Sequence, residues 1–355
     1  MPSPFASVLI DTYNHERFIE QAIVSVLEQD VPSAEMEVIV VDDGSTDSTP
    51  AIVGKFVPRV RYLRKENGGQ ASAFNAGIPE ARGEILAFLD GDDWWAPGKL
   101  RRVMDTMTAN PDLGMVGHSF VESFAGGGER VIAHGQLERL RLNSIPAAQA
   151  FRLRRCYFGT SRLTLRSEIA RKILPVPESL AFEADEYLFT VAAALAECAI
   201  LPDPLTYYRI HGGNLYLAGG ATSAGMRRKQ RVLESLVATL RTRLAGCGVP
   251  KDVADVVLEI VEAEEAQLRL TLDGGWPLET YRAETTIYRI QHHDAAWGQR
   301  LFRTLTMIPA LVLPPRWFYG ARRRLVAQSW YDRVRRSVLP APGFKDITEP
   351  RQVHE

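Results

Sequence analysis

The sequence predicts an α/β fold, in which a mostly parallel sheet is flanked by helices and followed by a C-terminal helical region. Short apolar, β-branched runs alternate with helix-like stretches over about the first 125 residues. This alternation is typical of a parallel sheet with helices on both faces. Beyond a glycine-rich passage, the chain continues as charged segments with helical spacing, which indicates a small helical subdomain.

The expected strands and helices of the sheet alternate along the chain. The expected strands are Ser7–Ile10, Val38–Val41, Val60–Leu63, Ile85–Leu89 and Met115–Val121. The expected helices between them are Glu16–Glu28, Thr49–Lys55, Ala71–Glu80 and Pro97–Thr108. Because ligands of such sheets bind beyond the carboxyl ends of the strands, we expect the chemistry in the loops that follow them.

The second half of the chain is expected to complete this domain and then to become helical. A loop-rich insertion is expected from Gly126 to Ala150, followed by a helix at Asp185–Glu197 and a strand that ends at Ile210. The flexible passage after it contains Gly212, Gly213, Gly219, Gly220 and Gly225. Further helices are expected at Met226–Ala245 and Asp252–Leu272. We therefore predict one domain over residues 1–215 and a helical, arginine-rich region over residues 216–355.

Composition excludes several classes of protein. Of the 355 residues, 46% are hydrophobic and 24% are charged, which is ordinary for a globular protein and not for a disordered, collagenous or coiled-coil one. The three cysteines are too widely spaced for a CxxC metal site or a disulfide framework. Because the sequence contains neither a bilayer-length apolar stretch nor a signal peptide, a cytoplasmic location is expected.

Charge is distributed unevenly along the chain. The net charge of the whole chain is −1. The segment between Gln299 and Arg336 has nine arginines and one acid, which gives it a charge of +8, so the rest of the chain carries −9. The nine are Arg300, Arg303, Arg316, Arg322, Arg323, Arg324, Arg333, Arg335 and Arg336. The uncharged stretch Thr304–Pro315 and the aromatic residues after it suit a membrane headgroup interface, so one hypothesis is peripheral contact with an anionic inner leaflet. The alternative is a basic helical subdomain packed on its own core. No nucleic-acid partner is expected, because the rest of the chain is acidic and no binding motif occurs.

Three carboxylates follow the fourth expected strand, in Asp90-Gly91-Asp92-Asp93. Like charges at this spacing repel one another unless a cation or water screens them. Carboxylate oxygens suit Mg²⁺ or Mn²⁺, and the D-x-D spacing lets Asp90 and Asp92 point into one crevice. The alternative interpretation is a solvated turn that caps the next helix.

Two other loops at the same sheet edge carry polar groups. After the second strand, Asp43 could accept a hydrogen bond from a ribose or a base, or the loop could only cap a helix. Tyr13, after the first strand, could stack on a base. Asn67-Gly68-Gly69-Gln70 is similar to a backbone nest for phosphate but matches neither GxGxxG nor the P-loop pattern.

Two positions in the second half of the domain could also take part in the chemistry. Asp185-Glu186 begins an expected helix, where acids are favoured by the dipole or could act as a general base. Arg209 and His211 lie two residues apart on one strand face, where they could bind phosphate or be structural.

Taken in order, these segments resemble the inverting nucleotide-sugar glycosyltransferases of family 2, which adopt the GT-A fold. The resemblance runs from Ser7 to about Asn214, roughly 60% of the chain. It is carried by Ser7–Asn14, Ala22–Gln29, Val38–Asp47, Asn67–Gly69, Asn75–Gly77, Ala81–Glu84, Leu89–Asp93 and Tyr207–His211.

The resemblance implies a role for each matching donor-side residue. Thr12 and Tyr13 would lie against the nucleotide, and Asp43 would hydrogen-bond its base or ribose. Asn67 and Gly69 would complete the donor site.

The resemblance also implies the metal and catalytic residues. Asp92 would be the direct metal ligand, with Asp90 on the ribose or on a metal-bound water. His211, with Arg209, would contact the diphosphate or help hold the metal, which would be Mn²⁺ or Mg²⁺. Either Asp185 or Glu186 would be the general base, and we prefer Asp185.

Three positions depart from the family pattern. Asp11 stands where Pro or Thr is common, and Phe74 where an Arg often precedes Asn75. The acidic pair reads Asp185-Glu186 where Glu-Asp is usual, which leaves the identity of the base open.

The expected activity is therefore metal-dependent, inverting transfer of a sugar from a nucleotide-diphosphate donor, with UDP the favoured nucleotide. The acceptor would be a carbohydrate or lipid-linked hydroxyl in bacterial cell-surface glycan or glycolipid assembly. Transfer would be non-processive, because no Q-x-x-R-W motif occurs. The alternatives are a non-catalytic nucleotide-sugar-binding protein, and another metal-dependent nucleotide enzyme on the same fold, such as a nucleotidyltransferase.

Overall fold

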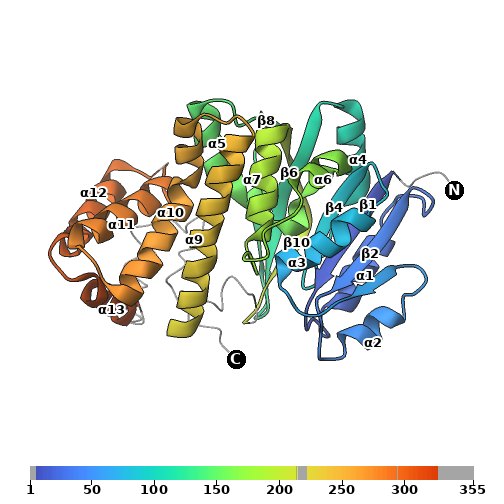
Figure 1. The fold of residues 1–355 in the computed structure, drawn as a ribbon, viewed down its shortest axis with the longest axis horizontal. Helices are drawn as coiled ribbons and strands as arrows, with labels where there is room; N and C mark the ends of the chain where they lie inside the picture. Colours follow the sequence, from blue (N-terminus) through green and yellow to red (C-terminus); the bar gives the residue numbers. More distant parts are fainter. Residues whose placement is uncertain (1–4, 213, 215–221, 294, 327–355) are drawn as a thin grey trace. The chain divides into compact units, whose positions relative to one another are not determined.

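The structure is a computed structural model that describes residues 5–212, 214, 222–293 and 295–326 (Figure 1). The described residues form two compact units. The first comprises the residues up to His211 together with Thr239–Ala254, and the second comprises the described residues between Gly212 and Ala238 and those from Asp255 onward. The predicted domain boundary after residue 215 stays a prediction. Three glycines of the expected flexible passage and three of the nine arginines lie outside the described residues, namely Gly213, Gly219, Gly220, Arg333, Arg335 and Arg336.

One ten-stranded sheet forms the centre of the first unit. Its main path runs β3-β2-β1-β4-β9-β6-β10-β5, while β7 pairs with β6 and β8 pairs with β10. The strands are β1 (Ala6–Thr12), β2 (Met36–Asp42), β3 (Arg61–Arg64), β4 (Ile85–Asp90), β5 (Trp94–Trp95), β6 (Leu113–Phe124), β7 (Glu129–Ile132), β8 (Glu138–Leu140), β9 (Thr164–Arg166) and β10 (Glu197–Ile210). All five expected strands are present as β1, β2, β3, β4 and β6, so the prediction of an α/β sheet fold is confirmed.

Strand direction changes within the sheet. β1 pairs in parallel with β2 and β4, β2 pairs in parallel with β3, and β6 pairs in parallel with β10. The short strand β9 lies antiparallel between β4 and β6, and it joins the two parallel sections. Gly126 to Ala150 was expected to be loop-rich, but this segment contains β7, β8 and the start of helix α5 (Ile145–Arg154). Its strands pair with the long neighbours β6 and β10, which supply a pairing edge that a local sequence pattern cannot show.

Helices cover both faces of the sheet, because alternate strand residues point to opposite sides. The helices of the first unit include α1 (Ile19–Leu27), α2 (Thr49–Gly54), α3 (Gln70–Gly77), α4 (Lys99–Ala109), α5, α6 (Ser167–Ile173) and α7 (Ala184–Leu195). Residues of α1 and α4 pack with Val8 and Ile10 of β1 in one buried core. On the other face, Gly77 of α3 lies so close to Leu9 that an added Cβ would come within 2.4 Å of Leu9 Cδ1. Gly77, the last residue of α3, therefore packs directly against β1.

The second unit is helical. Its described elements include parts of α9 (Ser223–Gly246) and α10 (Lys251–Asp273), together with α11 (Pro277–Gln291), α12 (Trp297–Thr306), the 3-10 helix η4 (Ile308–Leu311) and α13 (Pro315–Val326). The expected helices Met226–Ala245 and Asp252–Leu272 correspond to α9 and α10. Its core contains Leu270, Met307, Ala310 and Phe318. Among the described residues, no helix combines the length and the apolar character that a bilayer span needs.

Candidate active site

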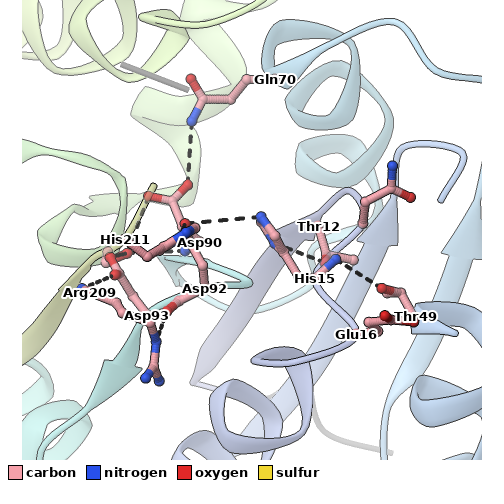
Figure 2. Close-up of polar contacts among 12 residues, drawn as sticks. Thr12, His15, Glu16, Thr49, Gln70, Asp90, Asp92, Asp93, Arg209 and His211 are labelled. Carbon is pink, nitrogen blue, oxygen red and sulfur yellow. Dashed lines mark hydrogen bonds and ion pairs between the residues drawn. The ribbon is translucent and has the colours of Figure 1, made fainter. Parts of the chain in front are cut away.

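An acidic cluster lies where β4 ends, at the carboxyl edge of the sheet (Figure 2). Asp90, Asp92 and Asp93 each offer a carboxylate oxygen, and these three oxygens lie within 4.8 Å of one another. Gly91 donates its backbone N–H to the carbonyl of Asp11 at 2.8 Å, which fastens the turn to the end of β1. Three carboxylates are thus held together by backbone contacts between neighbouring strands.

Ser161, in the 3-10 helix η3 (Thr160–Arg162), positions two of these carboxylates. Its hydroxyl donates to Asp93 Oδ2 at 2.6 Å, lies 3.3 Å from Asp90 Oδ2, and accepts the backbone N–H of Asp90 at 3.1 Å. Asp93 also accepts the N–H of Arg209 at 2.8 Å and is 1% exposed. Burial, followed by the charge of Asp92, raises the pKa of Asp93 to about 7. Asp93 therefore fixes the turn, while Asp90 and Asp92 are more open.

Two imidazoles flank Asp92. His211 Nε2 lies 3.0 Å from Asp92 Oδ2, and His15 Nε2 lies 4.0 Å from the same oxygen (Figure 2). Burial acts to raise the pKa of Asp92, but the hydrogen bond from His211 and the nearby His15 outweigh it, so that this pKa is lowered. The hydroxyl of Thr12 lies 3.2 Å from His15 Nδ1 and holds the ring in place. His15 was not predicted from the sequence, although it lies only two residues after Tyr13 in the loop that follows β1.

Asp11 adds a fourth carboxylate to the cluster. It lies opposite Asp90 in the parallel register of β1 and β4, and its Oδ1 is buried with no hydrogen-bond partner among the described residues. Burial, with the charges of Asp92, Asp185 and Asp43, raises the pKa of Asp11 well above its usual range. Burial, with the charges of Asp11 and Asp92, also raises the pKa of Asp90 well above its usual range.

These shifts carry two consequences for the site. His211 contacts Asp92, and the charges of Asp43, Asp92 and Asp185 all act on Asp11, while the convergence of these residues on one donor stays a prediction. A buried oxygen without a donor, beside clustered carboxylates, is also the environment in which a hard divalent cation is stabilised. The donor set therefore fits Mg²⁺ or Mn²⁺.

Arg209 joins β10 to the acidic turn. Its Nε donates to the carbonyl of Asp92 at 2.8 Å, and its Nη2 donates to Gln21 at 2.6 Å. The guanidinium carbon lies 4.7 Å from the ring centre of Phe18 and 4.4 Å from that of Trp94. The predicted donor-binding residue thus lies beside the cluster, where its side chain supports the turn.

Asp43 and the glycine loop form a second group at the same sheet edge. The Asp43 carboxylate accepts the backbone N–H groups of Gly68 at 3.0 Å and Gly69 at 2.6 Å, and it pairs with Lys65 at 2.6 Å. Asn67 Nδ2 donates to the Asp43 carbonyl at 3.0 Å. Gly69 has a φ of +83°, and an added Cβ would lie 2.7 Å from Ala181 Cα. Asp43 therefore fixes the backbone of the loop that contains Asn67 and Gly69.

Gln70 links this loop to the acidic pair at the start of α7. Its Nε2 lies 3.4 Å from Asp90 Oδ1 and donates to Thr160 Oγ1 at 3.1 Å, while its Oε1 accepts the N–H of Ala184 at 3.1 Å. Gln70 was expected only as part of the backbone nest, and no role was predicted for its side chain. Its contacts connect the end of β4 with the N-terminus of α7.

The two acids of the pair have different surroundings. Asp185 Oδ2 accepts the N–H of Thr160 at 3.1 Å, and the charge of Asp185 is felt by both Asp11 and Asp90. Glu186 instead receives Arg155 Nη1 on both oxygens, at 2.9 and 3.1 Å. Asp185 is therefore linked to Asp90 through Thr160 and Gln70, whereas Glu186 pairs with Arg155.

Tyr13 follows β1 directly and is 40% exposed, with Thr12 buried beneath it. Its exposed ring provides a face on which a planar ligand can stack. Every donor-side residue expected from the sequence thus lies in the first unit.

Comparisons with known proteins identify the relatives of this chain. A family model described as "Glycosyl transferase family 2" matches residues 7–169. The uncharacterized glycosyltransferase alr2836 of Nostoc sp. is 32% identical over 236 residues, which cover 64% of this chain and 72% of that protein. The succinoglycan biosynthesis protein ExoO of Rhizobium meliloti is 32% identical over 219 residues, covering 60% of this chain and 62% of ExoO.

Two solved structures share the fold. The structure of S. aureus TarS 1-349 in complex with UDP has a TM-score of 0.51 and 21% identity, and covers 80% of this chain and 88% of that chain. Mannosyltransferase PcManGT from Pyrobaculum calidifontis, in complex with GDP-Man and Mn²⁺, has a TM-score of 0.51 and 19% identity, and covers 86% and 81% respectively. At such identities the likeness concerns the fold alone.

Proposed function

The chain belongs to glycosyltransferase family 2 and is a glycosyltransferase of the GT-A fold, and from this premise we propose that it performs metal-dependent, inverting sugar transfer. The donor would be a nucleotide-diphosphate sugar and the acceptor a carbohydrate or lipid-linked hydroxyl. The observation that carries the proposal is the acidic cluster of Asp90 and Asp92, with His211 beside Asp92 and with Asp185 linked to Asp90 through Thr160 and Gln70.

The acidic cluster supports the metal dependence. Asp92 and Asp90, with His211 beside them, would hold a divalent cation, and Mn²⁺ and Mg²⁺ both suit their oxygen atoms. When bound, such a cation neutralises negative charge on a leaving diphosphate. The Mn²⁺ bound to the structural neighbour PcManGT is consistent with this assignment.

The donor would lie along the edge between the two groups of residues. Tyr13 would stack on the base, and Asp43 would hold Asn67 and Gly69 where their backbone approaches the nucleotide. Neighbours bound to UDP and to GDP-Man support a nucleotide-sugar donor of either kind, and we retain UDP as the first choice.

The chemical step follows from the position of Asp185. An acceptor hydroxyl is a weak nucleophile at neutral pH, so a carboxylate must remove its proton as it attacks. Asp185 would take that proton while the hydroxyl oxygen bonds to the anomeric carbon, on the face opposite the departing nucleotide diphosphate. The bond to the diphosphate breaks as the new bond forms, and this single displacement inverts the anomeric configuration.

The relatives support a biological setting. ExoO is named as a succinoglycan biosynthesis protein. We propose that this chain likewise assembles a bacterial cell-surface polysaccharide or glycolipid, adding sugars without processive polymerisation.

A donor screen tests the proposal. Purified protein is mixed with UDP-, GDP- and dTDP-sugars, with and without Mn²⁺, and its melting temperature is measured. We expect at least one donor to raise the melting temperature only with Mn²⁺, and Asp92→Ala to abolish both that rise and nucleoside diphosphate release. Asp203→Ala is the matched control, since this acid is 40% exposed and pairs with Arg102. A cation-independent response, or a normal response from Asp92→Ala, would overturn the metal assignment.

A further inference from the structure

A continuous segment of the second unit exposes large apolar side chains. We call them the apolar ridge. Trp297 is 78% exposed, Val312 is 73% exposed and Trp317 is 71% exposed, and each lies in α12, next to η4, or in α13. The complete ridge is Trp297, Leu301, Leu305, Ile308, Leu311, Val312 and Trp317. Isolated exposed apolar residues are ordinary, but seven within 21 positions of the chain indicate an interaction surface.

The geometry of α12 places part of this ridge on one side of the helix. Trp297, Leu301 and Leu305 are spaced four residues apart, so their side chains lie above one another along a single stripe. All three are exposed. The apolar stripe of α12 therefore faces solvent, although the apolar side of a surface helix normally faces the protein core.

One polar residue of α12, Arg303, contacts a buried acid of the second unit. Arg303 Nη2 donates to Glu284 Oε2 at 2.9 Å, and Arg322 Nη1 of α13 donates to the same oxygen at 2.6 Å. Glu284 is 1% exposed and also accepts Gln267 Nε2 at 2.6 Å. This buried polar centre fixes α12 and α13 with the ridge side chains pointing outward.

The core of the second unit does not use the ridge. Its buried members from this segment are Met307, Ala310, Phe318 and Tyr319, which pack against Leu270 of α10. The chain therefore fills its own core with one set of apolar residues and keeps a second set on the surface. The hypothesis of a basic subdomain that simply packs on itself does not account for this second set.

The chain segment that carries the ridge is basic. Residues 295–326 contain six arginines and neither aspartate nor glutamate. Two of the arginines hold Glu284, while Arg300, Arg316, Arg323 and Arg324 are exposed. Such a combination of tryptophan, aliphatic and arginine side chains matches the chemistry of an anionic lipid surface, where indoles lie at the headgroup level and guanidinium groups meet phosphates.

We propose that the apolar ridge binds the headgroup region of an anionic bilayer, with α12 lying along the surface and the exposed arginines pairing with lipid phosphates. Binding is peripheral and reversible, because the ridge has a single apolar stripe with charged residues beside it. This inference uses residues of the second unit alone, so it is independent of the donor chemistry proposed for the first.

Vesicle flotation tests the proposal. The full chain is incubated at low ionic strength with vesicles of phosphatidylcholine containing about one third phosphatidylglycerol, or with phosphatidylcholine alone, and then floated through a density gradient. We expect the protein to float with the anionic vesicles and at least tenfold less with the neutral ones. Raising the salt to about 0.5 M should release it, because the Debye length then falls to a few ångströms.

A ridge variant and a matched control identify the surface. Trp297→Ser combined with Leu301→Gln and Leu305→Gln should reduce flotation at least tenfold, with an unchanged melting temperature because these side chains are exposed. Val131→Ser combined with Leu137→Gln removes apolar residues that are 57% and 49% exposed in the first unit, and should leave flotation unchanged. Asp92→Ala should also float normally, which separates this inference from the catalytic one.

Three outcomes would overturn the inference. The wild-type protein fails to float with anionic vesicles, or the ridge variant floats as well as the wild type, or light scattering shows a dimer that the ridge variant abolishes while vesicles bind neither protein. The last outcome would assign the ridge to a second copy of the chain.

Discussion

Replacing Asp185 by asparagine distinguishes the two acids at the start of α7. The change removes the charge and the proton-accepting ability of the side chain but keeps its shape. Loss of a general base typically lowers turnover by about 10² to 10⁴-fold. Because Asp185 has no direct contact with Asp90 or Asp92 among the hydrogen bonds of the described residues, donor affinity should change by no more than about threefold, roughly 0.7 kcal/mol.

The structure also gives the expected cost in stability. The Asp185 carboxylate accepts the N–H of Thr160 at 3.1 Å on one oxygen and the N–H of Glu186 at 2.9 Å on the other. An asparagine has one carbonyl oxygen, so it can satisfy only one of these two donors. One partly buried N–H group left without an acceptor costs about 1–3 kcal/mol. Denaturant unfolding should therefore show a modest loss, and activity should be assayed well below the melting temperature.

Glu186→Gln is the matched comparison. In the wild type, Arg155 contacts both oxygens of Glu186. Glutamine keeps one of these acceptors, so we expect a loss in the free energy of unfolding of similar size, about 1–3 kcal/mol. Turnover should stay within about fivefold of the wild type, since this side chain faces Arg155 rather than the acidic cluster. The assay is release of nucleoside diphosphate under saturating donor and Mn²⁺. If Asp185→Asn keeps full activity while Glu186→Gln loses a hundredfold or more, the assignment of the base is wrong.

Two further predictions concern stability. Glu284→Ala should lower the free energy of unfolding by about 3–5 kcal/mol in urea titrations, because Arg303 and Arg322 lose a buried carboxylate. The control is Glu259→Ala. Because the partner of Glu259, Arg289, is exposed, this change should lower the free energy of unfolding by less than about 1 kcal/mol. Lys99→Met should raise the free energy of unfolding, because burial lowers the pKa of the Lys99 ammonium well below its usual range. Between the folded and unfolded pKa values of Lys99, the unfolded chain binds more protons than the native one. The stability of the wild-type protein therefore rises with pH in that range. The difference in the free energy of unfolding between Lys99→Met and the wild type should therefore shrink as pH rises toward 10, by up to about 1.4 kcal/mol per pH unit. A difference that does not change with pH in urea titrations would contradict this prediction.

The parts of the fold that the sequence predicted are those with a local pattern. β1, β2 and β4 are apolar, β-branched runs, and the carboxylates of Asp90 and Asp92 follow the last of them, so the sheet edge could be inferred before any contact was known. β9 could not be predicted in this way. It has three residues, Thr164–Arg166, and exists because β4 and β6 provide hydrogen-bonding edges on both sides of it.

In the candidate site, too, residues in local motifs were predicted and residues that act through distant contacts were not. Asp92 and His211 were expected because they belong to motifs at strand ends, whereas Ser161, Gln70 and His15 were missed. Ser161 acts on Asp90 across 71 positions of the chain, and Gln70 acts on Thr160 across 90, so no local spacing reports either contact. Residues that hold a catalytic group in place are therefore harder to predict from one sequence than the groups themselves.

The cluster of carboxylates is tolerated because of the strands that precede it. Ile10 and Leu89, one residue before Asp11 and Asp90, are completely buried, as are Val8 and Phe88. The burial of each such side chain contributes about 1.5–3 kcal/mol, which offsets part of the cost of holding the neighbouring carboxylates together. A cation bound between these carboxylates would remove that cost from the folded state alone, since the unfolded chain does not bring them together. Under the proposed function, cation and donor binding would therefore raise the melting temperature, which is the quantity that the donor screen measures.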